Sequence, residues 1–381
     1  MEWKEYSLGD ISKLKYGKNV SAKLCKGPVP IFSGYRKIGT CNTINCKKNT
    51  VIVIARGAGG CGDVKLTKED CFLTNLSISV ELDKGICNAK WFYYNHLLNN
   101  LSFLNSGSAQ PQITIDSLSK YLIRIPPIII QRKIAGILSA LDSKIENNNK
   151  INANLEAQAQ ALFKSWFVDF TPFKDQPFVD SELGPIPQGW KVGKLGDLGD
   201  IVGGSTPSKS KPEYYTTHGI AWLTPKDLST SKAKFTSRGE IDITDEGYNS
   251  TSTKLMPRGS VLFSSRAPIG YLTIAKNEIC TNQGFKSLVP NGAGTGFIYY
   301  SLRHLTPQIE NRATGSTFKE ASATLMRSVE TIVPPTSILN KFEELLRPIL
   351  QFQEKKEEEN QRLAALRDTL LPKLMSGEIK L

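Results

Sequence analysis

The chain has 381 residues, of which 40% are hydrophobic and 22% charged, and this length and mix suit two or three globular domains. It contains no apolar run long enough for a membrane span and does not open on a secretory leader, so we expect a cytoplasmic protein. Lys and Arg outnumber Asp and Glu by 48 to 36, and the resulting net charge of +12 favours a polyanionic partner.

The cysteines and histidines do not indicate metal chemistry, and we predict no metal site. None of the seven cysteines forms a CxxC pair, and the three histidines lie far apart. We interpret the cysteines as free thiols, with a loose zinc site at Cys41 and Cys46 as the alternative.

The texture of the sequence divides the chain into four segments. Two are rich in Gly, Ser, Thr, Lys and short β-branched runs, which indicate strands separated by turns, and two carry long helical patterns. The predicted segments, in chain order, are a mixed domain at 1–130, a helical region with a proline-rich, extended linker at 131–187, a second mixed domain at 188–336 and a second helical region at 337–381.

Short elements can be placed inside the mixed domains, which we expect to be α+β. The predicted strands are Thr50–Ala55, Leu76–Leu82, Ser260–Phe263 and Tyr271–Ala275, and the predicted helices are Trp91–Leu101 and Gly296–Leu305.

The positive charge is confined to the two mixed domains. Residues 1–130 carry 17 basic and 9 acidic side chains, and residues 188–336 carry 17 and 12, so their net charges are +8 and +5. The helical segments carry 6 against 7 and 8 against 8, which leaves −1 and 0. This segregation is typical of two binding surfaces on a neutral scaffold.

The order of textures repeats, and short landmarks repeat with it. Outside these landmarks the halves differ, so we infer one fold used twice with two surfaces. The matching landmarks are Trp3-Lys4 with Trp190-Lys191, Leu8-Gly9-Asp10 with Leu195-Gly196-Asp197, Arg56 and Gly60 with Arg266 and Gly270, Thr74-Asn75 with Thr281-Asn282, Ser106-Gly107-Ser108 with Thr314-Gly315-Ser316, and Ile125-Pro126-Pro127 with Val333-Pro334-Pro335.

Both helical segments carry a heptad seam that is apolar at its ends and polar in the middle. We favour mutual, antiparallel packing of the two helices over separate packing of each on its own domain. The run Glu354–Glu359 is predicted to be a solvated face. The polar seam residues predicted to fix the register are Asn148, Asn152, Gln353, Lys356 and Asn360.

Loops of the mixed domains hold the residue types that read DNA. Arg can bond guanine and Asn or Gln can bond adenine, while Lys, Ser and Thr hold phosphates. Candidates in the first domain are Arg36, Lys37, Lys47, Lys48, Arg56, Asn75, Ser108, Gln110 and Gln112. Candidates in the second are Ser205, Thr206, Ser208, Lys209, Lys211, Tyr214, Tyr215, Lys226, Arg266, Asn282, Gln283, Thr317 and Lys319.

Motifs for chemistry are missing from the sequence. The two Pro-Pro pairs lack the polar and aromatic neighbours that adenine methylation needs, and neither GxGxxG after a strand nor GxxxxGK[ST] is present. We therefore predict a reader without catalytic residues and without a cofactor of its own.

The chain resembles, over nearly its whole length, the specificity (S) subunit of type I restriction–modification systems. The resemblance is carried by Leu183–Trp190 (LGPIPQGW), Ala161–Phe170 (ALFKSWFVDF) and Leu370–Ile379 (LLPKLMSGEI). It implies two target recognition domains that each read half of a split double-stranded DNA site, joined by two long helices in an antiparallel coiled coil with a pseudo-twofold repeat.

The resemblance also implies partners for the chain. Two modification (M) subunits would bind S-adenosylmethionine and methylate adenine, and restriction (R) subunits would use ATP and Mg²⁺. The alternatives are the specificity chain of a fused methyltransferase–nuclease system, or a coiled-coil adaptor that binds no DNA.

Overall fold

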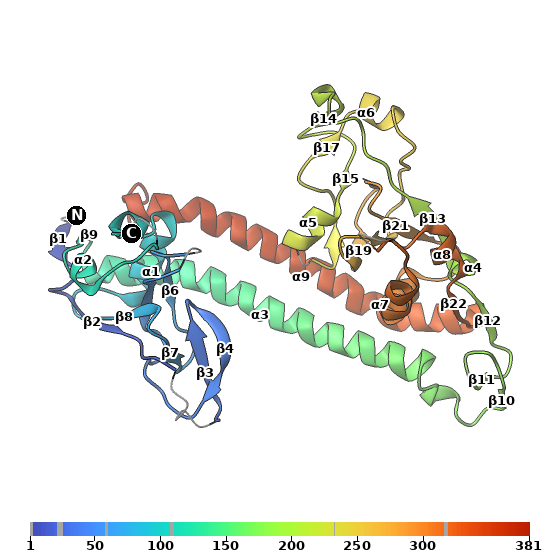
Figure 1. Cartoon of the computed structure of the whole chain (residues 1–381), viewed down its shortest axis with the longest axis horizontal. Coiled ribbons are helices and arrows are strands. Elements are labelled where there is room, and N and C mark those ends of the chain that lie inside the picture. Colours follow the sequence, from blue (N-terminus) through green and yellow to red (C-terminus); the bar gives the residue numbers. More distant parts are fainter. Residues whose placement is uncertain (1–2, 21–25, 58–59, 107–109, 232, 316–318) are drawn as a thin grey trace. The chain divides into compact units, whose positions relative to one another are not determined.

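The two long helices are shared between two units of the fold (Figure 1). The computed structural model describes residues 3–20, 26–57, 60–106, 110–231, 233–315 and 319–381. Unit 1 consists of residues 1–146 and 360–381, and unit 2 of residues 147–359. Each unit thus holds one mixed domain and part of both helices. The four-segment division made from the sequence stays a prediction.

Unit 1 is built around two small sheets. The residues of β5 are all buried because this β-branched strand lies between β8 and β6. One sheet has the order β2 (Ser12–Tyr16), β8 (Ser77–Leu82), β5 (Val51–Ile54), β6 (Val64–Leu66), and the other β4 (Arg36–Cys41), β3 (Val29–Ser33), β7 (Phe72–Leu73). The strands β1 (Lys4–Ser7) and β9 (Leu122–Ile125) form an antiparallel pair, and the helices are α1 (Ala89–Leu98), η1 (Ser102–Leu104) and α2 (Ile115–Ser119).

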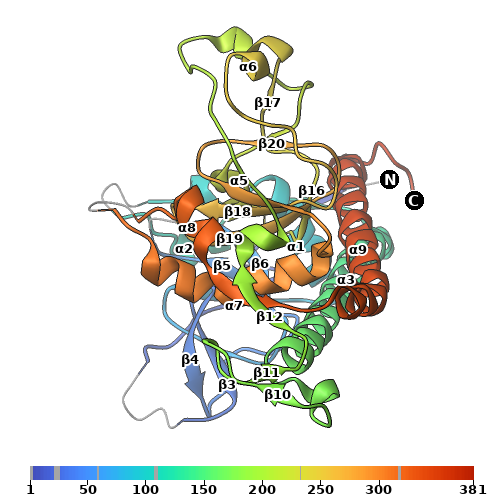
Figure 2. The same cartoon turned by 90° about the vertical axis from the view of Figure 1, so that its right-hand side faces the viewer.

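Unit 2 has a larger sheet, against which α7 packs (Figure 2). Its order is β13 (Gly199–Gly203), β21 (Lys286–Pro290), β18 (Val261–Ser265), β19 (Ile269–Ala275), β16 (Phe235–Thr236). The strand pairs are β12 (Lys191–Lys194) with β22 (Glu330–Val333), β14 (Tyr215–Thr216) with β17 (Asp242–Ile243), β15 (Trp222–Leu223) with β20 (Cys280–Thr281), and β10 (Phe178–Val179) with β11 (Ile186–Pro187). The helices are η2 (Thr171–Phe173), α4 (Leu195–Leu198), η3 (Pro212–Tyr214), α5 (Pro225–Thr230), α6 (Asp245–Asn249), α7 (Thr295–Arg312) and α8 (Ala323–Ser328).

The long helices are α3 (Ile128–Phe167) and α9 (Thr336–Ser376), and they pack on each other in both units. In unit 1, Leu138 of α3 shares a core with Leu371 of α9. In unit 2, Asn152 contacts Gln353 and Trp166 contacts Phe342, so the residue numbers rise along one helix as they fall along the other. The antiparallel arrangement expected from the seams is confirmed, and in each unit both helices also pack on the mixed domain.

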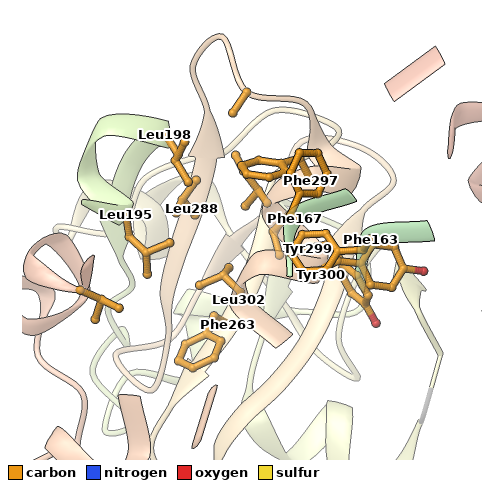
Figure 3. Close-up of a cluster of buried hydrophobic side chains, with 14 of the residues drawn as sticks. Phe163, Phe167, Leu195, Leu198, Phe263, Leu288, Phe297, Tyr299, Tyr300 and Leu302 are labelled. Carbon is orange, nitrogen blue, oxygen red and sulfur yellow. The ribbon is translucent and has the colours of Figure 1, made fainter. Parts of the chain in front are cut away.

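The core of unit 2 is rich in aromatic side chains (Figure 3). Phe163 and Phe167 of α3 meet Phe297 of α7, with ring centroids 6.0 and 4.8 Å apart. Trp190 packs on Phe167 at 5.8 Å. The predicted linker is therefore not simply extended: it forms a 3₁₀ turn and the β10–β11 hairpin, and its Phe173 is buried in this core.

The predicted internal repeat is confirmed by hydrogen bonds that recur in the two units. Ile113 N–H donates to the Ala55 carbonyl at 2.8 Å, and Ala321 N–H donates to the Ser265 carbonyl at 2.9 Å. These bonds place Arg56 and Arg266, which follow the two acceptors, in equivalent positions at the ends of β5 and β18. The strands and helices predicted inside the domains are present. Their ends differ by up to three residues, except that the helix predicted at 296–305 continues to Arg312.

One landmark of the repeat was matched one residue out of register. The carbonyls of Leu73 and Thr281 each accept a backbone N–H at 2.9 Å, and those of Leu76 and Gly284 each accept one at 2.8 Å. Both pairs differ by 208 in residue number, so Asn75 corresponds to Gln283, and Asn282 corresponds to Thr74. The repeated Thr-Asn letters had suggested a difference of 207 instead.

Candidate nucleic-acid interface

In unit 1, polar side chains gather around the end of β5. The backbone of Arg56 pairs with that of Gln112, and the Arg56 guanidinium lies over the Tyr16 ring, 5.9 Å from its centroid. Asn75 directly precedes Leu76, whose carbonyl accepts the Arg56 N–H at 3.3 Å. The Arg56 Nε is buried without a hydrogen-bond partner in the part of the chain that the structure describes. We call Tyr16, Arg56, Asn75 and Gln112 the first cluster.

In unit 2, the equivalent region carries charged side chains. Arg266 Nη1 lies 3.4 Å from Glu320 Oε2, and Lys286 Nζ lies 3.3 Å from Glu320 Oε1. The Thr206 hydroxyl donates to Gln283 Oε1. We call Thr206, Arg266, Gln283, Lys286 and Glu320 the second cluster.

The two clusters share a backbone frame and differ in chemistry. Because Ile113 and Ala321 make equivalent hydrogen bonds, the residues before them, Gln112 and Glu320, occupy equivalent positions. The first position offers an uncharged amide and the second a carboxylate paired with two cations. Equivalent positions with different side chains are what two surfaces of different specificity require.

Other predicted residues hold the framework of the second cluster. Ser205 N–H donates to the Thr281 carbonyl at 2.9 Å, and the Ser205 carbonyl accepts from Trp222 Nε1 at 3.2 Å. Asn282 Oδ1 accepts the Gly284 N–H at 2.9 Å, which turns the chain before β21. These contacts use the backbone of Ser205 and the side-chain oxygen of Asn282 in local structure.

Lys47 and Lys48 lie at the opposite end of β5 from Arg56. Lys47 Nζ pairs with Asp70 at 3.0 Å, and the Lys48 N–H donates to the same carboxylate at 2.8 Å, which lowers the Asp70 pKa. They border a concavity of about 660 Å³ whose charged lining residues are Lys47, Lys48, Lys84, Lys90, Arg132 and Glu81. Five cations and one carboxylate make this concavity suited to phosphate groups.

A further group of candidates lies in a part of unit 2 that projects beyond the five-stranded sheet, around β14, β17 and α6 (Figures 1 and 2). Lys211 Nζ donates to the Tyr214 hydroxyl at 3.0 Å, and both side chains are accessible. Tyr215 is structural, since its hydroxyl donates to the Pro207 carbonyl at 2.6 Å and its ring contacts Trp222. Lys209 is exposed nearby.

The remaining candidates are dispersed. Arg36 and Lys37 are exposed on β4, in the other sheet of unit 1. Ser108 and Thr317 lie outside the described residues. Gln110 is exposed, and the Ser208 hydroxyl is hydrogen-bonded to that of Ser210 at 2.8 Å. The Lys226 ammonium pairs with Glu240 at 3.2 Å, and the Lys319 ammonium lies 3.5 Å from the Glu310 carbonyl.

Several residues of the site were missed from the sequence. Glu320 could have been found, since it lies 208 residues after Gln112, the spacing of the Pro-Pro landmarks. Tyr16, Lys286 and Arg132 carry no local signal, because their importance depends on neighbours that are distant in sequence.

The polar residues of the helix seam contact one another inside unit 2. Asn148 Nδ2 donates to Glu359 Oε2 at 3.0 Å, and Asn152 Nδ2 donates to the Gln353 carbonyl at 3.3 Å. Lys356 Nζ pairs with Glu359 at 2.7 Å. Asn360 begins the α9 portion of unit 1. Their role in fixing the register stays a prediction.

The interpretation of Glu354–Glu359 as a solvated face was wrong. Glu354 pairs with Arg258 at 2.7 Å and is only 13% exposed. Glu357 accepts the backbone N–H groups of Lys234 and Phe235 at 3.0 and 3.2 Å. The run faces the domain of unit 2, and that packing could not be read from helical periodicity alone.

Six cysteines in the described ranges are free and buried, among them Cys41 and Cys46. Burial raises the pKa of the Cys280 thiol to about 12, so this sulfur is kept as an unreactive thiol. The same ranges contain no group of three His, Cys, Asp or Glu side chains that could hold a metal ion. Nor does any helix there have the length and apolar character needed to cross a bilayer.

The fold and the two clusters define a duplicated α+β protein with two basic domains that carry clusters of different chemistry. A family model described as "Type I restriction modification DNA specificity domain" matches residues 1–157 and 187–363. The chain therefore belongs to the type I restriction–modification DNA specificity family, as a specificity subunit.

Relatives agree with this assignment. The Type I restriction enzyme HindI specificity subunit of Haemophilus influenzae is 27% identical over an alignment of 470 residues that covers 99% of this chain and 100% of the relative. The MjaIX specificity subunit of Methanocaldococcus jannaschii is 36% identical over 179 residues, 44% of this chain and 41% of that protein. The crystal structure of a type I restriction–modification S subunit from M. genitalium has the same fold, with a TM-score of 0.71 at 18% identity, covering 98% of this chain and 96% of that one.

Proposed function

We propose that the chain reads a bipartite double-stranded DNA site, with one cluster on each half-site. The observation that carries this proposal is the equivalence of Gln112 and Glu320 on matching backbone frames, beside the equivalent Arg56 and Arg266. A single scaffold used twice with different side chains suits two half-sites of different sequence.

The chemistry of each cluster suggests how it reads bases. Arg56 and Arg266 can each donate two hydrogen bonds to the O6 and N7 atoms of guanine. Asn75 and Gln112 can bond adenine through both its acceptor and its amino group, whereas Glu320 can accept from the amino group of cytosine. The cations around the concavity of unit 1 supply phosphate contacts, which position the domain without reading sequence.

The chain is proposed to act within an assembly and to catalyse nothing alone. Two methyltransferase subunits with S-adenosylmethionine, and restriction subunits with ATP and Mg²⁺, supply the chemistry. Membership of the specificity family supports this division of labour. Ile129 of α3 and Leu345 and Leu366 of α9 expose roughly half or more of their surface, which offers apolar docking positions to partners. Such an assembly works on chromosomal DNA, so a cytoplasmic location is proposed.

The test is to express the chain with and without its methyltransferase subunits and to sequence the modified bases of host DNA. We expect site-specific adenine methylation at one split sequence, present only when both components are present. Methylation by the purified chain alone, or methylation without any shared sequence, would contradict the proposal. Retention on duplex DNA that falls steeply with salt would separate a DNA reader from an adaptor that binds protein.

A further inference from the structure

A buried lysine joins the domain of unit 2 to both of its helices. Lys234, directly before β16, is only 8% exposed. Its ammonium donates to Glu156 Oε2 of α3 at 2.7 Å, to the Tyr300 hydroxyl of α7 at 2.6 Å and to Gln353 Oε1 of α9 at 2.9 Å. An ammonium has three hydrogens, so each can find an acceptor.

The surroundings of Lys234 add directional restraints. The ammonium lies 4.7 Å from the ring centroids of both Tyr299 and Tyr300. Its backbone is held as well, because Glu357 of α9 accepts the Lys234 N–H at 3.0 Å. Hydrogen bonds from both the main chain and the side chain of Lys234 therefore attach this residue to the helices of unit 2.

Glu156 is the complementary centre of the same network. It accepts from the Tyr300 hydroxyl and from Arg303 Nη1, both at 2.9 Å. Burial opposes ionisation of Glu156, but the Lys234 ammonium beside it holds its pKa below the usual value. Burial also lowers the pKa of Lys234 despite this carboxylate. The two groups meet at 2.7 Å, and a buried ion pair depends on complete hydrogen bonding in one geometry.

Further contacts extend this attachment along α9. Arg258 of the domain pairs with Glu354, Lys276 pairs with Glu358, and Glu343 accepts the Phe297 N–H at 2.7 Å. From residue 343 to residue 358 the helix rises by about 22 Å. Contacts spread over this length resist rotation of the domain on the helices.

In unit 1, the contacts between the mixed domain and the long helices involve fewer charged side chains. Asp142 of α3 accepts from the Tyr94 hydroxyl at 2.6 Å and from Arg367 Nη1 at 2.8 Å. Gln131 accepts the Asn88 N–H at 2.7 Å. The domain of unit 1 contributes these neutral donors and an exposed cation, Lys68, which lies 3.7 Å from Glu146 of α3, whereas that of unit 2 contributes a buried cation.

We propose that Lys234 is a positioning residue that fixes the orientation of the second recognition domain on the helices and so sets the gap between the two half-sites. This rests on the proposed reading of a bipartite site. One base pair changes the position along DNA by about 3.4 Å and the facing direction by about 35°, because B-DNA turns once in about 10 base pairs. A domain free to turn by about that angle, and to shift by about that distance, would accept gaps of neighbouring lengths.

The experiment uses the complete chain with its methyltransferase subunits on duplexes that carry both half-sites at every gap length. Wild type is expected to methylate one gap length. K234M/E156Q removes both charges of the pair together and is expected to raise methylation at gaps one base pair longer and shorter by about tenfold relative to the best gap. The sequence preference within each half-site should not change. K254M, at an exposed lysine of the same domain, should behave as wild type.

The variants also separate positioning from stability. K234R keeps the charge and should restore a narrow gap preference. Should K234M/E156Q fail to fold in thermal unfolding, Y300F keeps the ring and removes one acceptor, and it should broaden the gap preference to a smaller degree. A folded K234M/E156Q with one gap length, or a change of half-site sequence in place of gap length, overturns the proposal. No site-specific methylation by wild type would overturn the proposed function instead.

Discussion

Exchanging the side chains at positions 112 and 320 tests whether the two clusters face DNA. Glu320→Gln removes the carboxylate that lies 3.4 Å from Arg266 and 3.3 Å from Lys286. Glu320 is 37% exposed, so solvent screens its ion pairs with Arg266 and Lys286, and the loss of each should cost at most about 1 kcal/mol of stability. The fold should persist while two cations become available to phosphates or bases.

The expected size of the effect follows from counterion release. Removing one negative charge from the DNA-facing surface should steepen the plot of log K against log salt concentration by about 0.9. Between roughly 50 and 200 mM salt, that slope corresponds to about 3.5-fold in the affinity for non-specific duplex. Gln112→Glu in the first cluster should change the slope by the same amount in the opposite direction.

The assay is fluorescence anisotropy of a labelled duplex with the chain and its methyltransferase subunits across a salt series. E278Q, at an exposed carboxylate of unit 2 outside the second cluster, serves as the control. If E320Q and Q112E both have the slope of E278Q, the clusters do not face DNA and the argument from their equivalence fails. Sequencing of the methylated sites should also show a changed base preference in one half-site for each variant.

Three other predictions concern separate parts of the chain. Arg56→Ala should weaken binding to the specific duplex by about 1–3 kcal/mol and leave non-specific binding nearly unchanged in the same assay, while an equal loss on both duplexes would indicate a phosphate contact. Deleting 141–147 together with 361–367, the stretch in which Arg367 pairs with Asp142, should shorten the gap by about 3 base pairs, because seven helical residues rise about 10.5 Å. An unchanged gap in the methylated sites would refute the spacer role. Burial lowers the pKa of His96 to about 4, so below pH 6.5 the unfolded chain binds a proton that the folded chain does not bind. The free energy of unfolding should therefore fall by about 3 kcal/mol between pH 6.5 and 4. Denaturant unfolding of His96→Gln should lack that part of the pH dependence.

Periodicity and duplication were sufficient to predict most of the fold. The heptad seams placed α3 and α9, and β-branched runs such as 50–55 placed central strands, because these patterns report burial directly. The linker was misjudged because its prolines indicate extended chain, while the burial of Phe173 depends on its packing against Trp166 and Trp190 in the core.

The site could be predicted only in part. Arg56 and Arg266 were found because the repeat brought them into register. Glu320 was overlooked because the search for candidates favoured cationic, amide and hydroxyl side chains, and its contacts with Arg266 and Lys286 come only from the fold. Lys234 had no signal at all, since its acceptors are supplied by residues 156, 300 and 353. Contacts over such distances in sequence are set by tertiary structure.

The acidic run of α9 limits how recognition domains can be exchanged. Glu354, Glu357 and Glu358 are matched by Arg258, the backbone at Lys234, and Lys276. A foreign domain grafted between the helices would have to bring cations and free N–H groups at corresponding places, or it would leave carboxylates buried and unpaired. In a chimaeric protein, the domain should therefore be transferred together with the stretch of α9 that it contacts.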